Sequence, residues 1–128
     1  MYNLVRGPEA GKLFHDKGRG NGYVVTFGDK RVYLSGDTEC TPEMKALTEI
    51  DVAFVCMNLP YTMTPEEAAG CVAAFDPKVV YPYHYGESDL TKFSSALAAE
   101  QGKDAKAEGQ VAHPVASEIR LRDWYMKK

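Results

Sequence analysis

The chain has 128 residues, of which 45% are hydrophobic and 26% charged, and its formal net charge is −3 at pH 7. This length allows one domain with a single core over residues 1–128, and the acidic balance gives no basic surface for a nucleic-acid partner. The sequence contains no apolar run near the roughly 20 residues of a membrane span, and its N-terminus lacks the apolar core of a signal peptide. We therefore expect a cytoplasmic protein that binds neither membrane nor nucleic acid.

The three cysteines, Cys40, Cys56 and Cys71, are an odd number and contain no CxxC pair. This argues against a disulfide framework and against a cysteine zinc site. We expect all three to be small buried hydrophobic residues.

Residues 1–21 have no hydrophobic periodicity and are interrupted by several glycines and a proline, so we predict an irregular lead-in. A complete domain seldom begins with so long an irregular segment. A missing upstream half would leave such a start.

The predicted core spans residues 22–101. Gly22 to Phe27 is rich in β-branched and aromatic residues and is followed by a tight turn, and Arg31 to Ser35 returns as its hairpin partner. Thr41-Pro42-Glu43 predicts the start of a short helix that reaches about Thr48. The apolar run in 50–56 does not alternate, which is typical of a strand covered on both faces.

A capping box at Thr64-Pro65-Glu66-Glu67 begins the next predicted helix, and Pro77 ends it. Because a strand precedes and follows this helix, residues 50–81 form a βαβ unit, which is right-handed by default. A last helix is predicted for 89–101, ended by Gly102. We expect 103–117 to be a loop and 118–124 an edge strand.

Polar residues follow three of the predicted strands. Asp37, Asn58 and His84 each come shortly after a strand ends. If the strands are parallel, the three residues lie along one edge of the sheet, where functional groups gather in open α/β folds.

Three segments together resemble the C-terminal half of the metallo-β-lactamase superfamily, in its branch of lactonase-like metal-dependent hydrolases. They are GNGYVVTFGDKRVYLSGDTE, IDVAFVCMNLPYTMTPEEAA and PKVVYPYHY. In that family the acid of GDT bridges two metal ions, and the histidine of PxHY completes the ligand set of one ion. The resemblance implies these roles for Asp37 and His84.

The family's other metal ligands come from a His-x-His-x-Asp-His motif in its N-terminal half, which this sequence lacks. A catalytic zinc needs three protein ligands and an open position. His15, which precedes the first strand, is the candidate third ligand, and Lys17, Asn58 and Tyr61 are candidate substrate contacts. Without the resemblance, an acid in Gly-Asp-Thr more often stabilises a turn, and Tyr61 belongs to the turn before Thr64.

The resemblance also predicts the fold class, an α/β half of an αββα sandwich. One mixed sheet has helices on one face, and a partner covers the other. An uncovered face of roughly 800 Å² matches one side of a standard interface. If this face stays exposed to water, the protein loses on the order of 10 kcal/mol of hydrophobic stabilisation. The simplest cover is a second copy, which makes a homodimer.

Three functional hypotheses follow. In the first, dimerisation completes a metal site, with zinc expected first and manganese or iron as alternatives, and the protein hydrolyses an ester, lactone or phosphoester. In the second, the chemistry is lost, and the protein is a binding or assembly module for a small-molecule ligand or partner protein. In the third, a separately encoded half supplies the missing ligands.

Overall fold

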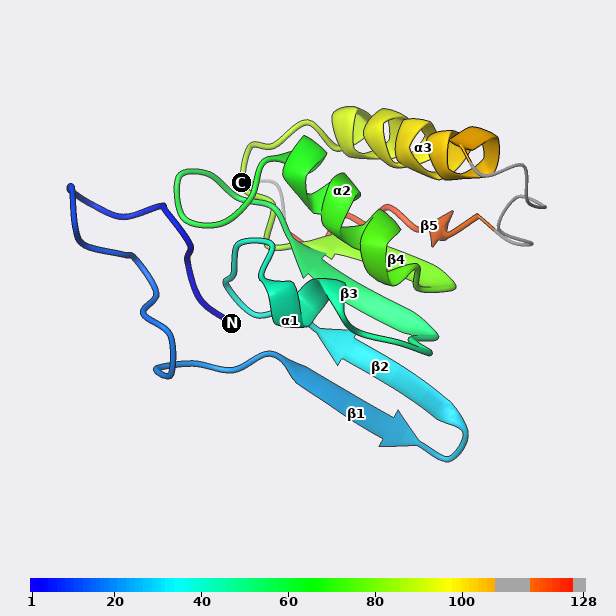
Figure 1. Cartoon of the computed structure of the whole chain (residues 1–128), viewed down its shortest axis with the longest axis horizontal. Coiled ribbons are helices and arrows are strands. Elements are labelled where there is room, and N and C mark those ends of the chain that lie inside the picture. The colour runs from blue at the N-terminus through cyan, green and yellow to red at the C-terminus, as the bar shows by residue number, and fades with distance from the viewer. Residues whose placement is uncertain (108–115, 126–128) are drawn as a thin grey trace.

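One mixed sheet of five strands organises the chain (Figure 1). The computed structural model describes residues 1–107 and 116–125, and side chains up to residue 102 and from 116. Strand β1 runs antiparallel to β2, whereas β2, β3, β4 and β5 are parallel to their neighbours, in the spatial order β1-β2-β3-β4-β5. The bounds are β1 Tyr23–Phe27, β2 Lys30–Leu34, β3 Val52–Cys56, β4 Val79–Tyr83 and β5 Glu118–Ile119.

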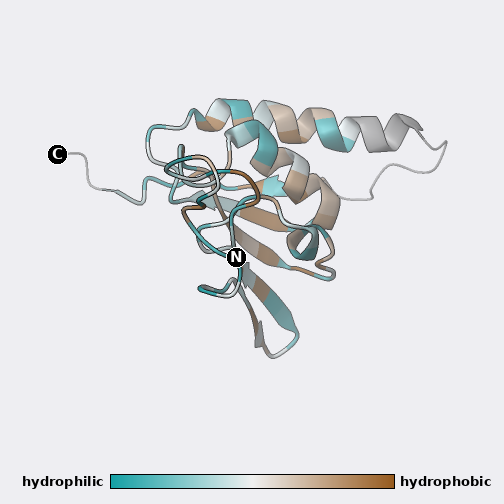
Figure 2. Cartoon of the chain, turned by 60° about the vertical axis from the view of Figure 1, so that its left-hand side comes forward, coloured by the Kyte–Doolittle hydropathy of each residue, from teal (hydrophilic) through white to brown (hydrophobic). Residues whose placement is uncertain are grey.

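Three helices lie on one side of this sheet: α1 Pro42–Lys45, α2 Pro65–Phe75 and α3 Leu90–Ala107. Helices α2 and α3 run beside each other (Figure 1), and the strands beneath them are among the more hydrophobic parts of the chain (Figure 2). Phe93 and Leu97 of α3 are fully buried in the core with Ala53 and Val55 of β3. The expected α/β class with helices on one face is confirmed.

Helix α2 begins at the predicted capping box. The Thr64 hydroxyl accepts a hydrogen bond from the Glu67 backbone N–H at 3.0 Å, and the Glu67 carboxylate accepts one from the Thr64 N–H at 2.8 Å. This arrangement satisfies two donors that the helix start would otherwise leave unpaired.

The opposite face of the sheet carries two continuous apolar rows. Strand register aligns one row across Tyr23, Leu34, Phe54 and Tyr81, and the second across Val25, Val32, Val52 and Val79. These side chains are half-buried or exposed, whereas the alternate positions of β3 and β4 are fully buried under the helices. Hydrophobic burial is therefore complete on only one face of the sheet.

The chain's own C-terminal segment covers part of this second face. The Trp124 ring lies 6.3 Å from Phe54 and 6.0 Å from Tyr81, measured between centroids, and its indole N–H donates to the Pro82 carbonyl at 2.8 Å. Trp124 itself remains 45% exposed. The predicted edge strand at 118–124 is therefore too long, because only Glu118–Ile119 pairs with β4 and the chain then crosses the sheet.

The predicted end of the last helix is also wrong. Helix α3 continues through Gly102 to Ala107, so the predicted loop at 103–117 begins as helix. Glycine costs a helix only about 1 kcal/mol relative to alanine, and good helix formers follow it here. Residues 108–115 of that predicted loop lie outside the described part. Helix α1 is shorter than predicted, since Ala46 is its C-cap.

Two cysteines that we expected to be free form a disulfide. Cys40, in the loop after β2, is bonded to Cys71 of α2, with 5.7 Å between their Cα atoms. The pair is 31 residues apart in sequence, so only the packing of the loop on α2 brings it together. The chain-entropy model assigns a loop of this size roughly 3–4 kcal/mol of stabilisation. Cys56 is free and buried, as predicted.

Residues 1–21 contain no helix or strand, as predicted, but they are firmly attached to the fold. Oε2 of the buried Glu39 accepts hydrogen bonds from the backbone N–H groups of Leu4, Val5 and Arg6 at 2.6, 2.9 and 3.0 Å. Oε1 pairs with the Arg6 guanidinium at 3.0 Å. One carboxylate therefore fixes the N-terminal segment against the loop after β2.

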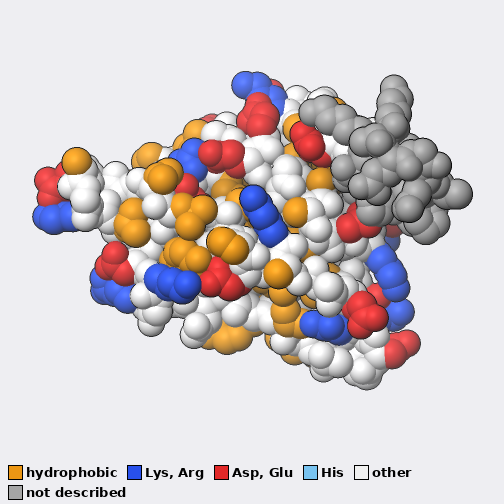
Figure 3. Space-filling model, in the orientation of Figure 1, with side chains coloured by type: hydrophobic (Ala, Val, Ile, Leu, Met, Phe, Trp, Pro, Cys, Tyr) orange, Lys and Arg blue, Asp and Glu red, His pale blue; other side chains and the backbone are white. Residues whose placement is uncertain are grey.

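Among the described residues, no helix is long and apolar enough to cross a membrane. On the face shown in space-filling view, positive and negative side chains are interspersed among hydrophobic ones (Figure 3).

The Glu39 contacts predict a pH-dependent stability. Burial by itself would raise the pKa of Glu39, but hydrogen bonds from Arg6, Val5 and Leu4 outweigh it and hold the pKa below its ordinary 4.5. A depressed pKa stabilises the fold above the unfolded value, and this contribution is lost as the pH falls through the folded pKa. We expect Glu39→Gln to lower the free energy of unfolding by about 1–3 kcal/mol at pH 7, and by less below pH 4.5, measured by urea denaturation.

Glu87→Gln, at an exposed loop position, is the matched control and should leave stability nearly unchanged at both pH values. An equal loss for Glu39→Gln at every pH would contradict the role assigned to the ionised carboxylate.

Candidate functional site

The carboxyl ends of the parallel strands bring the predicted acid and histidine together. Asp37 follows β2 by three residues and His84 follows β4 directly. His84 Nε2 lies 3.2 Å from Asp37 Oδ1. The predicted convergence at this sheet edge is therefore present in the structure.

His15 joins the same cluster from the N-terminal segment. Its Nε2 lies 3.5 Å from Asp37 Oδ2, so the two imidazoles contact different oxygens of one carboxylate. The three side chains are 24–45% exposed, which leaves the cluster open to a small molecule from solvent.

Two backbone features fix the loop that carries Asp37. Gly36 has φ +64°, a conformation that glycine adopts without strain, and its N–H donates to the Tyr83 hydroxyl at 3.0 Å. The Ser35 hydroxyl accepts from the Cys56 N–H at 3.1 Å. The loop after β2 is thus tied to both β3 and β4.

His84 has an unusual backbone conformation for a non-glycine residue, with φ +45°. The left-handed region costs such a residue roughly 1–2 kcal/mol, and residues held there cluster at functional sites. The His84 carbonyl accepts a hydrogen bond from Met57 N–H at 3.4 Å, which ties this turn to the end of β3.

Asn3 holds His15 in place. The Asn3 side-chain oxygen accepts from the His15 backbone N–H at 2.7 Å and lies 2.8 Å from His15 Nδ1. Its amide nitrogen donates to the Tyr61 carbonyl at 2.8 Å, which sets the orientation of the amide group. Since an amide oxygen only accepts, His15 carries a proton on Nδ1 and directs Nε2 at Asp37.

This assignment has a chemical consequence at the cluster. With Nδ1 protonated, a neutral His15 presents a lone pair on Nε2, and the Asp37 oxygen 3.5 Å away is also an acceptor. Two acceptors at this distance repel each other unless the positive charge of a proton or a cation lies between them. A second proton on His15 supplies that charge, and so does a metal ion.

The donor types suit a transition metal, but the set is incomplete. Zinc takes imidazole nitrogen and carboxylate oxygen at about 2.0–2.2 Å in a tetrahedron, which separates neighbouring donors by about 3.3–3.6 Å, near the 3.2 and 3.5 Å found here. Within the described residues, however, no group of three or more His, Cys, Asp or Glu side chains could hold a metal ion. The pairwise distances fit a metal, whereas the cluster alone does not enclose one.

The three candidate substrate contacts have different surroundings. Lys17 pairs with Glu43 of α1 at 3.0 Å and lies over the Tyr2 ring. The Asn58 side-chain oxygen accepts from the Thr62 hydroxyl at 2.9 Å. Tyr61 is 47% exposed and packs edge-on against Phe14. Their contact with a substrate stays a prediction.

Neither Asn3 nor Glu39 is identified by the sequence patterns, although both residues shape the site. Both are buried polar residues that bind backbone groups of the irregular N-terminal segment. Periodicity and motif spacing cannot detect such contacts, because they join segments without regular structure.

Comparison with known proteins identifies relatives of this chain. The family model described as the beta-lactamase superfamily domain matches residues 4–84. A UPF0173 metal-dependent hydrolase of Symbiobacterium thermophilum is 36% identical over 104 residues, which cover 76% of this chain and 46% of that protein.

Solved structures of metal-dependent hydrolases also resemble this chain. A protein from Parabacteroides distasonis is 42% identical with a TM-score of 0.62, and the match covers 81% of this chain and 40% of that one. A metallo hydrolase from Ignicoccus hospitalis is 26% identical with a TM-score of 0.63, covering 84% and 44%. The chain therefore spans less than half the length of these relatives, and it belongs to the β-lactamase superfamily.

Proposed function

We propose that this chain acts in metal-dependent hydrolysis, with Asp37, His15 and His84 supplying part of the ligand set for a divalent metal ion. The observation that carries the proposal is the Asp37 carboxylate shared by two imidazoles, at 3.2 and 3.5 Å. The names of the relatives as metal-dependent hydrolases support it. When bound, the metal ion would activate water for attack on an ester, lactone or phosphoester, and zinc is the ion we expect first.

The chain's own residues have distinct roles in this proposal. Asp37 and the two histidines bind the ion and remain accessible from solvent. Asn3 is a positioning residue, since it directs His15 Nε2 toward Asp37. Such partners of metal-bound histidines typically strengthen metal binding 10–100-fold.

We further propose that a second copy of the chain completes the site by covering the open sheet face. Two apolar rows cross four strands there, and Tyr23 and Phe27 at the β1 end are 58% and 65% exposed. Contiguous exposed apolar residues of this kind are typical of interaction sites. In this account the additional ligands come from the partner, because Asp37, His15 and His84 do not form a complete metal site within the described residues of one chain.

The second candidate function is a binding or assembly module that has lost the metal centre. The observation in its favour is that the described residues contain no complete ligand set. Zinc binding separates the two candidates.

We expect the purified protein to bind about one zinc ion per dimer, measured by isothermal titration calorimetry, because the described residues of one chain form no complete metal site. Asp37→Ala should abolish binding. The matched control Asp29→Ala, at the exposed hairpin turn, should bind as the wild type does. Failure of the wild-type protein to bind zinc, manganese or iron would favour the second candidate.

Asn3→Ala should weaken zinc binding about 10–100-fold, because the His15 ring loses the acceptor that orients it. Asn21→Ala, at an exposed position before β1, serves as the control. Unchanged affinity in Asn3→Ala would show that His15 is not a ligand or needs no such support.

Sedimentation equilibrium tests the proposed dimer. We expect the wild type to be dimeric and Phe27→Lys to weaken the dimer, since the charge would face an apolar interface. Val5→Lys is the control, because Val5 is 79% exposed and lies outside the sheet. A monomeric wild type would contradict the proposal of a second copy.

A further inference from the structure

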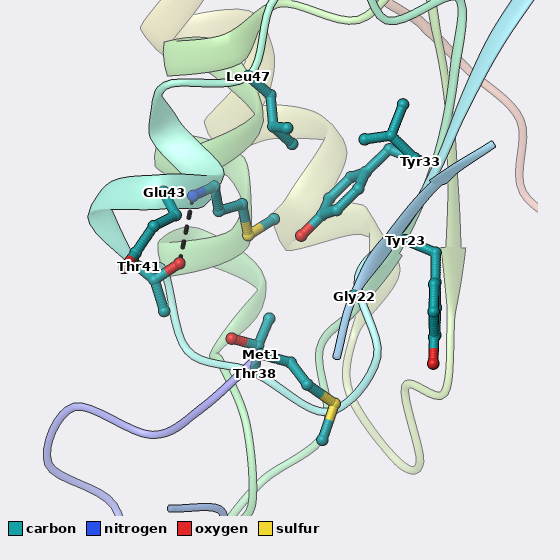
Figure 4. A pocket seen from close by; sticks show the side chains of 10 residues that line it. Met1, Gly22, Tyr23, Tyr33, Thr38, Thr41, Glu43 and Leu47 are labelled. Carbon is teal, nitrogen blue, oxygen red and sulfur yellow. Dashed lines mark hydrogen bonds between the residues drawn. The ribbon is translucent and has the colours of Figure 1, made fainter. Parts of the chain in front are cut away.

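A small cavity lies between the β1–β2 hairpin and helix α1, on the helix side of the sheet (Figure 4). Its volume is about 170 Å³. The walls combine the hairpin, α1, the loop between β2 and α1, and the first residue of the chain. The lining residues that matter here are Met1, Val24, Tyr33, Thr38, Met44 and Leu47.

The hydroxyl of Tyr33 distinguishes this cavity. Tyr33 is only 6% exposed, and its ring is fixed edge-on against Phe75 of α2 at 5.6 Å. Its hydroxyl makes no hydrogen bond to any residue that the structure describes. Since no fully buried side-chain oxygen or nitrogen there lacks a partner, the hydroxyl must reach the open space of the cavity.

The half-buried tyrosines in β4 and shortly after it differ from Tyr33, because their hydroxyls are hydrogen-bonded. The Tyr83 hydroxyl accepts from Gly36 N–H, the Tyr81 hydroxyl from Arg120, and the Tyr85 hydroxyl donates to the Arg122 carbonyl. A tyrosine hydroxyl is already protonated at neutral pH, and burial raises the pKa of Tyr33 further. Tyr33 therefore presents a neutral, unused hydrogen-bond donor.

Three other polar side chains of the lining, those of Thr38, Thr41 and Glu43, are already engaged. The Thr38 hydroxyl bonds backbone groups of Tyr2 and Glu39, and the Thr41 hydroxyl accepts from the Met44 N–H. The Glu43 carboxylate binds Lys17 and the Tyr2 hydroxyl. Much of the remaining lining is apolar, with Val24 and Leu47 beside two methionines, Met1 and Met44, and methionine side chains adapt to the shape of a ligand.

We propose that this cavity binds a small neutral molecule with an apolar body and one hydrogen-bond acceptor, which accepts a hydrogen bond from the Tyr33 hydroxyl. The volume suits a body about the size of benzene, since an apolar cavity of about 150 Å³ holds that molecule. An aryl or alkyl ketone, ester or lactone carbonyl meets the requirement. This site uses none of the Asp37 cluster and stands independently of the proposed metal chemistry.

Two probes of the same shape test the proposal: acetophenone, which has a carbonyl acceptor, and ethylbenzene, which has none. Each is titrated into protein carrying ¹³C-methyl methionine and followed by NMR. We expect saturable shifts of the Met1 and Met44 methyl signals. Acetophenone should bind about 2–10-fold more tightly than ethylbenzene, which is the gain in affinity that one neutral hydrogen bond contributes. Met63, which is fully buried and does not line the cavity, is the internal control.

Two variants make the test specific. Tyr33→Phe removes only the unpaired hydroxyl and should erase the preference for acetophenone, with the thermal midpoint confirming that the variant is folded. Leu47→Phe fills the cavity and should lower the affinity for both probes at least several-fold. This variant keeps the test decisive if Tyr33→Phe does not fold. The absence of saturable shifts, equal shifts at Met63, or a preference retained in Tyr33→Phe would overturn the proposal.

Discussion

The carboxylate of Asp37 is the group on which the site depends. It meets two imidazoles from segments that are far apart in the sequence, His84 after β4 and His15 from the N-terminal segment. The hydrogen bond between Asn3 and His15 Nδ1 makes the facing nitrogen an acceptor unless it gains a second proton. A positive charge between these acceptor atoms stabilises the cluster, and this is the physical basis for proposing a metal ion there.

The structure holds this cluster by ordering a segment that has no regular secondary structure. Glu39, two residues beyond Asp37, binds three successive backbone N–H groups of the N-terminal segment, and the Cys40–Cys71 disulfide ties the same loop to α2. The segment thus gains through side-chain contacts the rigidity that strands and helices gain from their backbone. A ligand from an irregular segment can be as well placed as one from a strand end.

Local patterns predicted the elements that local forces decide. The hairpin, the start of α2 at Thr64, and the convergence of Asp37 and His84 at one sheet edge follow from turn residues, capping and strand direction. The Cys40–Cys71 disulfide and the role of Asn3 could not be predicted, because they join residues that only the complete fold brings together. The predicted end of α3 lies too early in the chain. A single glycine costs a helix little, and the helix-forming residues around Gly102 outweigh this cost.

Anomalous diffraction at the zinc absorption edge, from crystals grown with zinc, tests the central claim most directly. The account predicts a peak at the Asp37 carboxylate within bonding distance, about 2.0–2.2 Å, of at least one of the imidazole nitrogens Nε2 of His15 and His84. Crystals with zinc bound elsewhere, or without an anomalous peak at this cluster, would contradict it.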